Sequence, residues 1–546
     1  MKSQKVDLII HNAQIHTLDP NNTIYEAIAI KDGKILELGP QRQILNKYSA
    51  KESIDAQGKE VYPGFIDAHG HMLMYAKQLL GVDLRGVRSQ EELVLRCEQY
   101  KATHPNLKFL IGRGWDQTLW ADWQMPTNHK LNALFKDIPV CLYRIDGHAA
   151  LVNEYLIQQS AIVDQLNHIQ GGAVVFAKTN LDETTNAAAI NITSQLVKQK
   201  KINLQDYKPT GVLIDNAVDF VQAYLPNYSK SEYLEALVQV QDELLQYGIT
   251  GVHEAGIDFE HIAWFKELIS KNKLSINIYA MLMDSPKNRA FAAEHGPFEY
   301  KNLSIQSFKC FADGALGSRG ALLKAPYEDH QNDYGLLLTD VQKMNDLAKF
   351  CLEHGYQMNT HSIGDSANAL VLSIYEQVFN EKPDHRFRIE HAQILDPKDF
   401  LKFSQFAVFP SVQPTHAISD ADWAEKRLGI HRLKGAYAYR TLLEKFGMLA
   451  LGTDFPVEQI NPFATIEAAL YNPFGETLEL EAILRGMTIH AAFAAFQENR
   501  IGSLEKGKEA TLAILNNPIS EQRSQVQNYA WRTFIKGKCV FKLDEL

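Results

Sequence analysis

Residues 229–256 read SKSEYLEALVQVQDELLQYGITGVHEAG, and this stretch decides the fold. Ser229 and Glu232 have the spacing of a capping box, and apolar residues follow at helical intervals. Gly248 then precedes the apolar run ITGV, which is typical of a strand. Residues 339–365, TDVQKMNDLAKFCLEHGYQMNTHSIGD, repeat this order of helix, glycine and strand. Helices that alternate with strands in this way predict βαβ units around a parallel sheet.

The two ends of the chain have a different pattern from this middle part. Residues 1–60 contain short strand-like runs such as VDLII and AIAIKDGKILEL. Residues 497–546 contain IGSLEKGKEATLAIL and RTFIKGKCVFKL, which are again punctuated by glycine. We therefore expect both ends to form one composite β-sandwich domain.

The composition narrows the class of protein. A chain of 546 residues with 45% hydrophobic and 22% charged residues has room for a large α/β barrel and a smaller domain. The net charge of −10 and the lack of a Lys/Arg-rich run argue against nucleic acid as a partner. The apolar runs are too short for a signal peptide or a membrane span, and the five scattered cysteines fit a reducing compartment. We expect no membrane partner and a cytoplasmic location.

Polar residues follow strand-like runs at several places. In VYPGFIDAHGHM, His69 and His71 are two residues apart, so on a strand both imidazoles point to one side, which suits Zn²⁺. Chance alone would give about 0.7 such H-x-H pairs in a chain with 19 histidines. His361 and His391 also follow apolar runs, and Asp454 closes LALGTD. Because barrel active sites lie where the strands end, these positions favour one common site.

Lys309 lies in the apolar run LSIQSFKCFADG. Burial among apolar neighbours would lower the pKa of its ammonium group and favour a neutral amine. The ordinary alternative is an edge lysine whose stem packs against the protein while its ammonium group reaches water. The chemistry of this segment alone leaves both interpretations open.

Several motifs together resemble the amidohydrolase superfamily: PGFIDAHGH, FKCFADGALGSR, NTHSIGD, RIEHAQ and GTDFPV. The sequence is most similar to the family-3 branch that includes N-substituted formamide deformylases, and this similarity extends to residues 112–120 and 505–512. The resemblance implies a (β/α)8 TIM-like barrel formed by residues 61–74 and 231–496. It also implies a metal-dependent hydrolase that cleaves the C–N bond of an amide, an N-substituted formamide or a cyclic amide.

In that superfamily, an H-x-H pair lies on the first barrel strand and a carboxylated lysine on the fourth. Histidines follow on the fifth and sixth strands, and an aspartate on the eighth. The resemblance therefore implies one or two divalent metals, most simply Zn²⁺, on six ligands: His69, His71, carboxylated Lys309, His361, His391 and Asp454. Asp454 would also act as the catalytic acid–base group. His71 and Lys309 are 238 residues apart, so residues 75–230 are expected to form an insertion subdomain with room for an early barrel strand.

Four residues are candidates for contacts with a small-molecule substrate: Trp115, His148, Arg319 and Gln413. Trp115 would wall an apolar pocket, although tryptophans more often belong to a core. Arg319 would bind a substrate carboxylate, but a structural ion pair explains it equally well.

Two other functions stay open from the sequence. One is a non-hydrolytic member of the superfamily, such as an isomerase or a decarboxylase, because a fold does not fix a function. The other is a regulatory protein on a degenerate barrel, which a metal content near zero would favour. A phosphate-binding α/β protein is disfavoured because neither G-x-x-x-x-G-K-[ST] nor a strand-linked G-x-G-x-x-G is present. A homo-oligomer also stays open.

Overall fold

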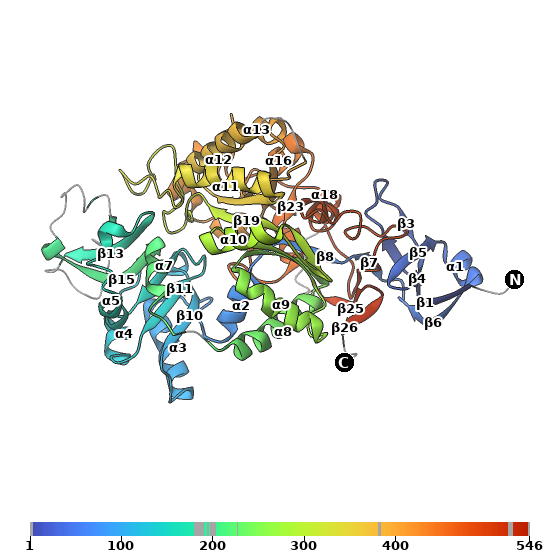
Figure 1. Cartoon of the computed structure of the whole chain (residues 1–546), viewed down its shortest axis with the longest axis horizontal. Coiled ribbons are helices and arrows are strands. Elements are labelled where there is room, and N and C mark those ends of the chain that lie inside the picture. The colour runs from blue at the N-terminus through green and yellow to red at the C-terminus, as the bar shows by residue number, and fades with distance from the viewer. Residues whose placement is uncertain are drawn as a thin grey trace.

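The structure is a computed structural model of the chain, and it describes residues 4–178, 190–193, 196, 204–226, 228–379, 384–521 and 528–543. Figure 1 shows three parts side by side. The β-rich part with both chain ends lies at one side, a barrel lies in the middle, and the insertion lies at the other side. None of the described helices combines the length and the apolar character that a membrane crossing requires.

The middle part is the predicted (β/α)8 barrel. Neighbouring strands of its path are parallel and follow one another in chain order. The eight strands are β8 (Phe65–Gly70), β16 (Ile249–Ile257), β17 (Asn277–Met283), β19 (Leu303–Phe311), β20 (Gln357–Ser362), β21 (Arg388–His391), β22 (Phe409–Val412) and β23 (Ala450–Leu451). The chain after β23 reaches back to β8, because the Asp454 amide donates to the His69 carbonyl at 2.7 Å. The barrel is therefore nearly closed.

Helices cover the outside of the barrel and bury their apolar faces against it. They include α8 (Lys230–Gln246), α9 (Phe259–Ser270), α11 (Val341–His354), α12 (Asp365–Val378), α16 (Tyr439–Phe446) and α17 (Pro462–Leu470). The capping box predicted at Ser229 is confirmed, since Ser229 and Glu232 each bind the other's backbone amide. Helix α11 ends at Gly355, whose φ of +74° is a left-handed conformation that favours glycine.

The two ends of the chain share a β-sandwich. One sheet has the order β5-β4-β1-β6, with β1 (Gln4–His11), β4 (Ala27–Lys31), β5 (Lys34–Gly39) and β6 (Tyr48–Asp55). The other has the order β26-β25-β24-β7-β2-β3, with β2 (Gln14–His16), β3 (Ile24–Tyr25), β7 (Glu60–Pro63), β24 (Leu512–Leu515), β25 (Ala530–Ile535) and β26 (Lys538–Lys542). Strand β7 from the N-terminal part pairs with β24 from the C-terminal part. Because β7 extends to Pro63, the barrel begins with β8, later than residue 61.

The segment between α2 (Met72–Leu79) and α8 forms a sheet of its own. Its described strands are β9 (Val82–Asp83), β10 (Leu110–Trp115), β11 (Val140–Arg144), β12 (Ala149–Val152), β13 (Gly172–Lys178), β14 (Ile190–Thr193) and β15 (Tyr207–Asp215). None of these strands joins the barrel path, so the early barrel strand for which this segment had room is not among them. Helices α3 (Gln90–Thr103), α5 (Glu154–Ser160) and α7 (Asn216–Gln222) flank the sheet.

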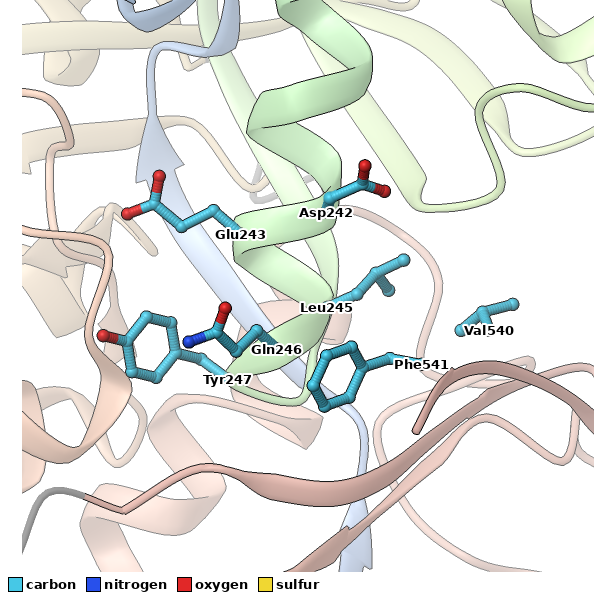
Figure 2. A pocket seen from close by; sticks show the side chains of 7 residues that line it. All are labelled: Asp242, Glu243, Leu245, Gln246, Tyr247, Val540 and Phe541. Atoms are coloured by element: carbon cyan, nitrogen blue, oxygen red, sulfur yellow. The ribbon is translucent and has the colours of Figure 1, made fainter. Parts of the chain in front are cut away.

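Figure 2 shows a small hollow where the barrel meets the sandwich, between the end of α8 and β26. It is lined by Asp242, Glu243, Leu245, Gln246, Tyr247, Val540 and Phe541. Helix α8 ends here just before β16 begins, so the hollow lies at the amino ends of the barrel strands. Active sites of such barrels lie at the opposite, carboxyl ends.

Candidate metal centre

Polar side chains from the carboxyl ends of the barrel strands converge on one centre. His71 Nε2 lies 3.0 Å from Asp454 Oδ1, and His69 Nε2 lies 3.6 Å from the same oxygen. Ligand atoms of His69, His391 and Asp454 all lie within 4.8 Å of one another. The imidazole of His361 packs against that of His391, with 4.5 Å between ring centroids. The strand-end positions singled out in the sequence therefore do meet in space.

Lys309, on β19, points into this centre. Its Nζ lies 3.2 Å from His69 Nε2, and the residue is only 1% exposed. The structure thus excludes the alternative in which the ammonium group reaches water. Burial lowers the pKa of Lys309 to about 8, although the carboxylates of Glu390 and Asp454 act in the opposite direction. A substantial fraction of the amine is neutral near that pH.

The charge state of the other side chains suits a divalent cation. Burial lowers the pKa of His71 to about 4, against the raising effect of Asp454, and burial also keeps His361 and His391 neutral. Burial would raise the pKa of Asp454, but the contact with His71 and the nearby imidazoles hold it well below its usual range. Buried His361 Nε2 has no hydrogen-bond partner among the described residues. Neutral imidazoles around one carboxylate are the donor set that Zn²⁺ prefers.

Two side chains orient the imidazoles of His69 and His391 through contacts with their Nδ1 atoms. Glu390 Oε2 lies 2.6 Å from His69 Nδ1, and Gln413 Oε1 lies 2.7 Å from His391 Nδ1. Acceptors at Nδ1 hold the proton there and leave Nε2 free for a cation. Burial would raise the pKa of Glu390, but its contacts with His69 lower it to about 2. Gln413 does not line the cavity, so its predicted role in substrate binding is replaced by the positioning of His391.

The backbone is strained at two of the candidate ligands. His391 has φ +74° and Asp454 has φ +61°, a left-handed region that non-glycine residues rarely adopt. Such strain persists where the surroundings fix it, and it is common at functional sites. The neighbouring chain comes very close at Gly452, where an added Cβ would lie 2.5 Å from the His69 amide nitrogen. Glycine is required there by this close approach.

Sequence reasoning missed three residues of the centre: Glu390, His416 and Asp67. His416, on α14 (Pro414–Asp420), places Nε2 3.6 Å from Asp454 Oδ2. Asp67 accepts hydrogen bonds from the amides of His69 and Thr453, and so connects β8 to the end of β23. Each lies within three residues of a residue that the sequence did single out, and this proximity was the available signal.

We predict that Glu390→Gln weakens zinc binding about tenfold, because an amide is a poorer acceptor for the His69 Nδ1 proton than a carboxylate. Zinc affinity measured by competition with a chelator tests this. Glu243→Gln is the matched control, since Glu243 accepts a hydrogen bond from Tyr75 and contacts none of the candidate ligands. Equal zinc affinity of both variants would remove Glu390 from the support of the centre.

The centre opens into a cavity of about 1160 Å³ between the barrel and the insertion. His148 lines this cavity, as predicted for a substrate contact, and its ring centroid lies 5.0 Å from that of His361. Its Nδ1 lies 2.7 Å from Asp215 Oδ1. Apolar walls come from side chains such as Met74, Trp264 and Trp423.

Two other predicted substrate contacts lie outside the cavity. Trp115 is fully buried in the core of the insertion, where its Nε1 donates to the Leu142 carbonyl at 2.7 Å. Arg319 forms two hydrogen bonds to the Asp329 carboxylate, so the ion-pair interpretation is correct for it. The reason for the error at Trp115 is a β-bulge between Arg113 and Trp115, which shifts the register of β10 against β11.

Comparison with known proteins agrees with this geometry. The model of the amidohydrolase family matches residues 52–186 and 200–541. The chain belongs to the amidohydrolase family. The resemblance and the barrel predicted from the sequence are thereby confirmed, and family membership supports a hydrolase.

Similar proteins cover nearly the whole amidohydrolase chain. Protein LONG AFTER FAR-RED 3 of Arabidopsis thaliana is 30% identical to this chain, and the alignment covers 98% of this chain and 91% of that protein. The N-substituted formamide deformylase of Arthrobacter pascens is 22% identical, with 98% of each chain covered. The crystal structure of an uncharacterized metal-dependent hydrolase from Pyrococcus furiosus has a TM-score of 0.70 at 27% identity, covering 94% of this chain and 99% of that one.

Proposed function

We propose that the chain is a metal-dependent amidohydrolase that hydrolyses the C–N bond of an amide, an N-substituted formamide or a cyclic amide. The observation that carries the proposal is the convergence of His69, His391 and Asp454 within 4.8 Å at the carboxyl ends of the barrel strands. The similarity to a formamide deformylase and to a metal-dependent hydrolase supports the same reaction class.

The residues present fit one or two divalent cations, and zinc suits the donors best. The proposed ligands are His69, His71, His361, His391, Asp454 and Lys309, the last as a carbamate. A divalent cation bound there would supply Lewis acidity, which lowers the pKa of water and polarises a carbonyl group.

The protein's own side chains would move the protons. The pKa of Asp454 lies well below its usual range, and its buried Oδ1 has no hydrogen-bond partner among the described residues, so the carboxylate can accept a proton from the attacking water. It would then return this proton to the leaving nitrogen, acting first as base and then as acid. His148 lies beside His361 in the wall of the cavity and is the proposed contact for the substrate carbonyl oxygen.

We predict that the purified protein contains between one and two equivalents of divalent metal per chain, because six candidate ligands converge at one buried site. Elemental analysis of protein supplemented with zinc measures this. Dialysis against a chelator should remove the metal and the turnover of formamides and amides together, and added zinc should restore both. A folded protein that stays metal-free after supplementation would favour the regulatory alternative.

A screen of simple amides, formamides and cyclic amides tests the reaction itself. Release of amine from an amide or a formamide, or ring opening of a cyclic amide, by metal-loaded protein supports hydrolysis. Metal-loaded protein that converts none of them would favour the non-hydrolytic alternative.

A further inference from the structure

A buried cation lines the wall of the cavity that the insertion provides. Arg113, at the end of β10, is 5% exposed, and one Nη donates to the Ile145 carbonyl at 2.8 Å. Its Nε has no hydrogen-bond partner, and none of the described carboxylates forms an ion pair with it. Burial lowers the pKa of Arg113 to about 10, against the raising effect of Asp146 and Asp454, so the group is charged at neutral pH. A buried charge without a counter-charge is costly, which points to a missing partner.

The local sequence holds this guanidinium in the cavity. The β-bulge that turns Trp115 into the core leaves Arg113 on the cavity side. Gly147 gives the group its space, because a Cβ at that position would lie 2.9 Å from Arg113 Nη2. The φ of Gly147 is +77°, a value that also favours glycine.

Three more polar side chains, those of Lys77, Gln78 and Tyr143, line the same cavity as Arg113. Both side-chain polar atoms of Gln78 and the hydroxyl of Tyr143 are buried and have no hydrogen-bond partner among the described residues. Lys77 Nζ lies 5.6 Å from the centre of the Tyr143 ring, and no ion pair of Lys77 occurs in the described part of the chain. All three residues line the cavity that also contains His71 and Asp454. Unsatisfied donors gathered at one wall are typical of a site prepared for an acceptor.

The charges at this wall favour an anion. The buried acids nearby already have partners, since Asp146 accepts from Arg144 and Asp215 from His148. Neither Arg113 nor Lys77 forms an ion pair with a carboxylate of the described residues, and a planar carboxylate fits the fork of a guanidinium.

Acids on the barrel side also line the cavity. Two of them are Asp420, at the end of α14, and Glu458, which follows β23. Burial raises the pKa of both to about 7, so each is only partly ionised at neutral pH. A substrate carboxylate would be attracted to Arg113 and Lys77 and not to these acids.

We propose that Arg113, together with Lys77, Gln78 and Tyr143, binds a carboxylate of the substrate. The substrates are then amides or formamides that carry a carboxylate, such as N-acyl and N-formyl amino acids. That an amide or formamide bond is cleaved is taken from the proposed function. The anion-binding site, by contrast, is inferred only from the residues of the cavity wall. The preferred substrate class is thus narrower than amides in general.

The test compares matched pairs of compounds, N-formyl and N-acetyl amino acids beside their carboxamides. We expect the zinc-loaded full-length protein to prefer the carboxylates in kcat/KM. Arg113→Met should lower kcat/KM for the carboxylates about 30-fold, mainly through KM, and change the carboxamides less than about threefold. Arg88→Met is the matched control, because Arg88 is an exposed arginine of the same subdomain outside the cavity.

Calorimetric titration of the same pairs provides a readout that needs no turnover. The carboxylates should bind more tightly than the carboxamides, and Arg113→Met should abolish this difference while the metal content stays unchanged. Tyr143→Phe removes a single oxygen, should fold normally, and should weaken the carboxylates several-fold. Carboxylate binding that depends on Arg113 without any hydrolysis would overturn the proposed function but keep the subsite. An unchanged preference in the Arg113→Met and Tyr143→Phe variants, or no binding of any carboxylate, would overturn this inference.

Discussion

Asp454→Asn is expected to retain the fold and most of the metal but to lower kcat by about 10²-fold or more. An amide cannot take up the proton that the carboxylate would carry from water to the leaving nitrogen. The side chain lies between His71 and His69, and its backbone is held by the His69 carbonyl. Since an asparagine has nearly the same shape, the strained backbone and the packing should survive.

Three measurements separate this effect from a structural one: kcat, metal content and Tm. Asp396→Asn is the control, because Asp396 is an acid on the protein surface that pairs with Lys324. It should leave all three values unchanged. Activity of Asp454→Asn within a few-fold of the parent protein would assign the proton transfer to another residue.

Lys309→Ala is expected to lose metal and activity together, the activity by about 10²-fold or more. Two divalent cations among neutral imidazoles and a single aspartate already carry an excess of positive charge, and an ammonium group 3.2 Å from His69 Nε2 would increase it. The ammonium group first loses a proton, and addition of the resulting neutral amine to CO₂ forms an N–C bond and releases a second proton, so that a charge of +1 is replaced by −1. The pKa of about 8 makes the neutral amine accessible.

Chemical rescue makes this prediction specific. Short carboxylates such as acetate or propionate should partly restore metal binding and activity to Lys309→Ala. Lys309→Met, which fills the space of the stem, should not be rescued. A crystal structure of the zinc-loaded protein should show extra density beyond Nζ. An unmodified lysine beside a fully occupied metal site would contradict the proposal.

The sequence predicted those features that depend on local pattern. The capping box at Ser229 and the glycine stop at Gly355 identify helices because their signals lie within a few residues. The positions of His69 and Asp454 were accessible for a related reason. Each closes an apolar strand, and in a parallel barrel the carboxyl ends of all strands meet at one rim.

Features that depend on long-range contacts were not accessible. Gln413 resembles a substrate contact in sequence, but its partner His391 becomes visible only when β21 and β22 lie side by side. The side on which Trp115 lies depends on a single bulge, which exchanges the two faces of β10. The sequence predicted that Trp115 lines the cavity, but the residue that does so is Arg113, two positions earlier.

The pairing of β7 with β24 has a consequence for the folding of the protein during its synthesis on the ribosome. Strand β7 ends at Pro63, yet its partner begins only at Leu512, roughly 450 residues later in the chain. At about 5–20 residues per second, β7 waits for about 20 to 90 seconds with one edge open. Strand β8, which carries His69, follows β7 directly, but its partner β16 begins much earlier, at Ile249. An open edge invites association with other nascent chains, so an early protector of this edge, such as a chaperone, would raise the yield.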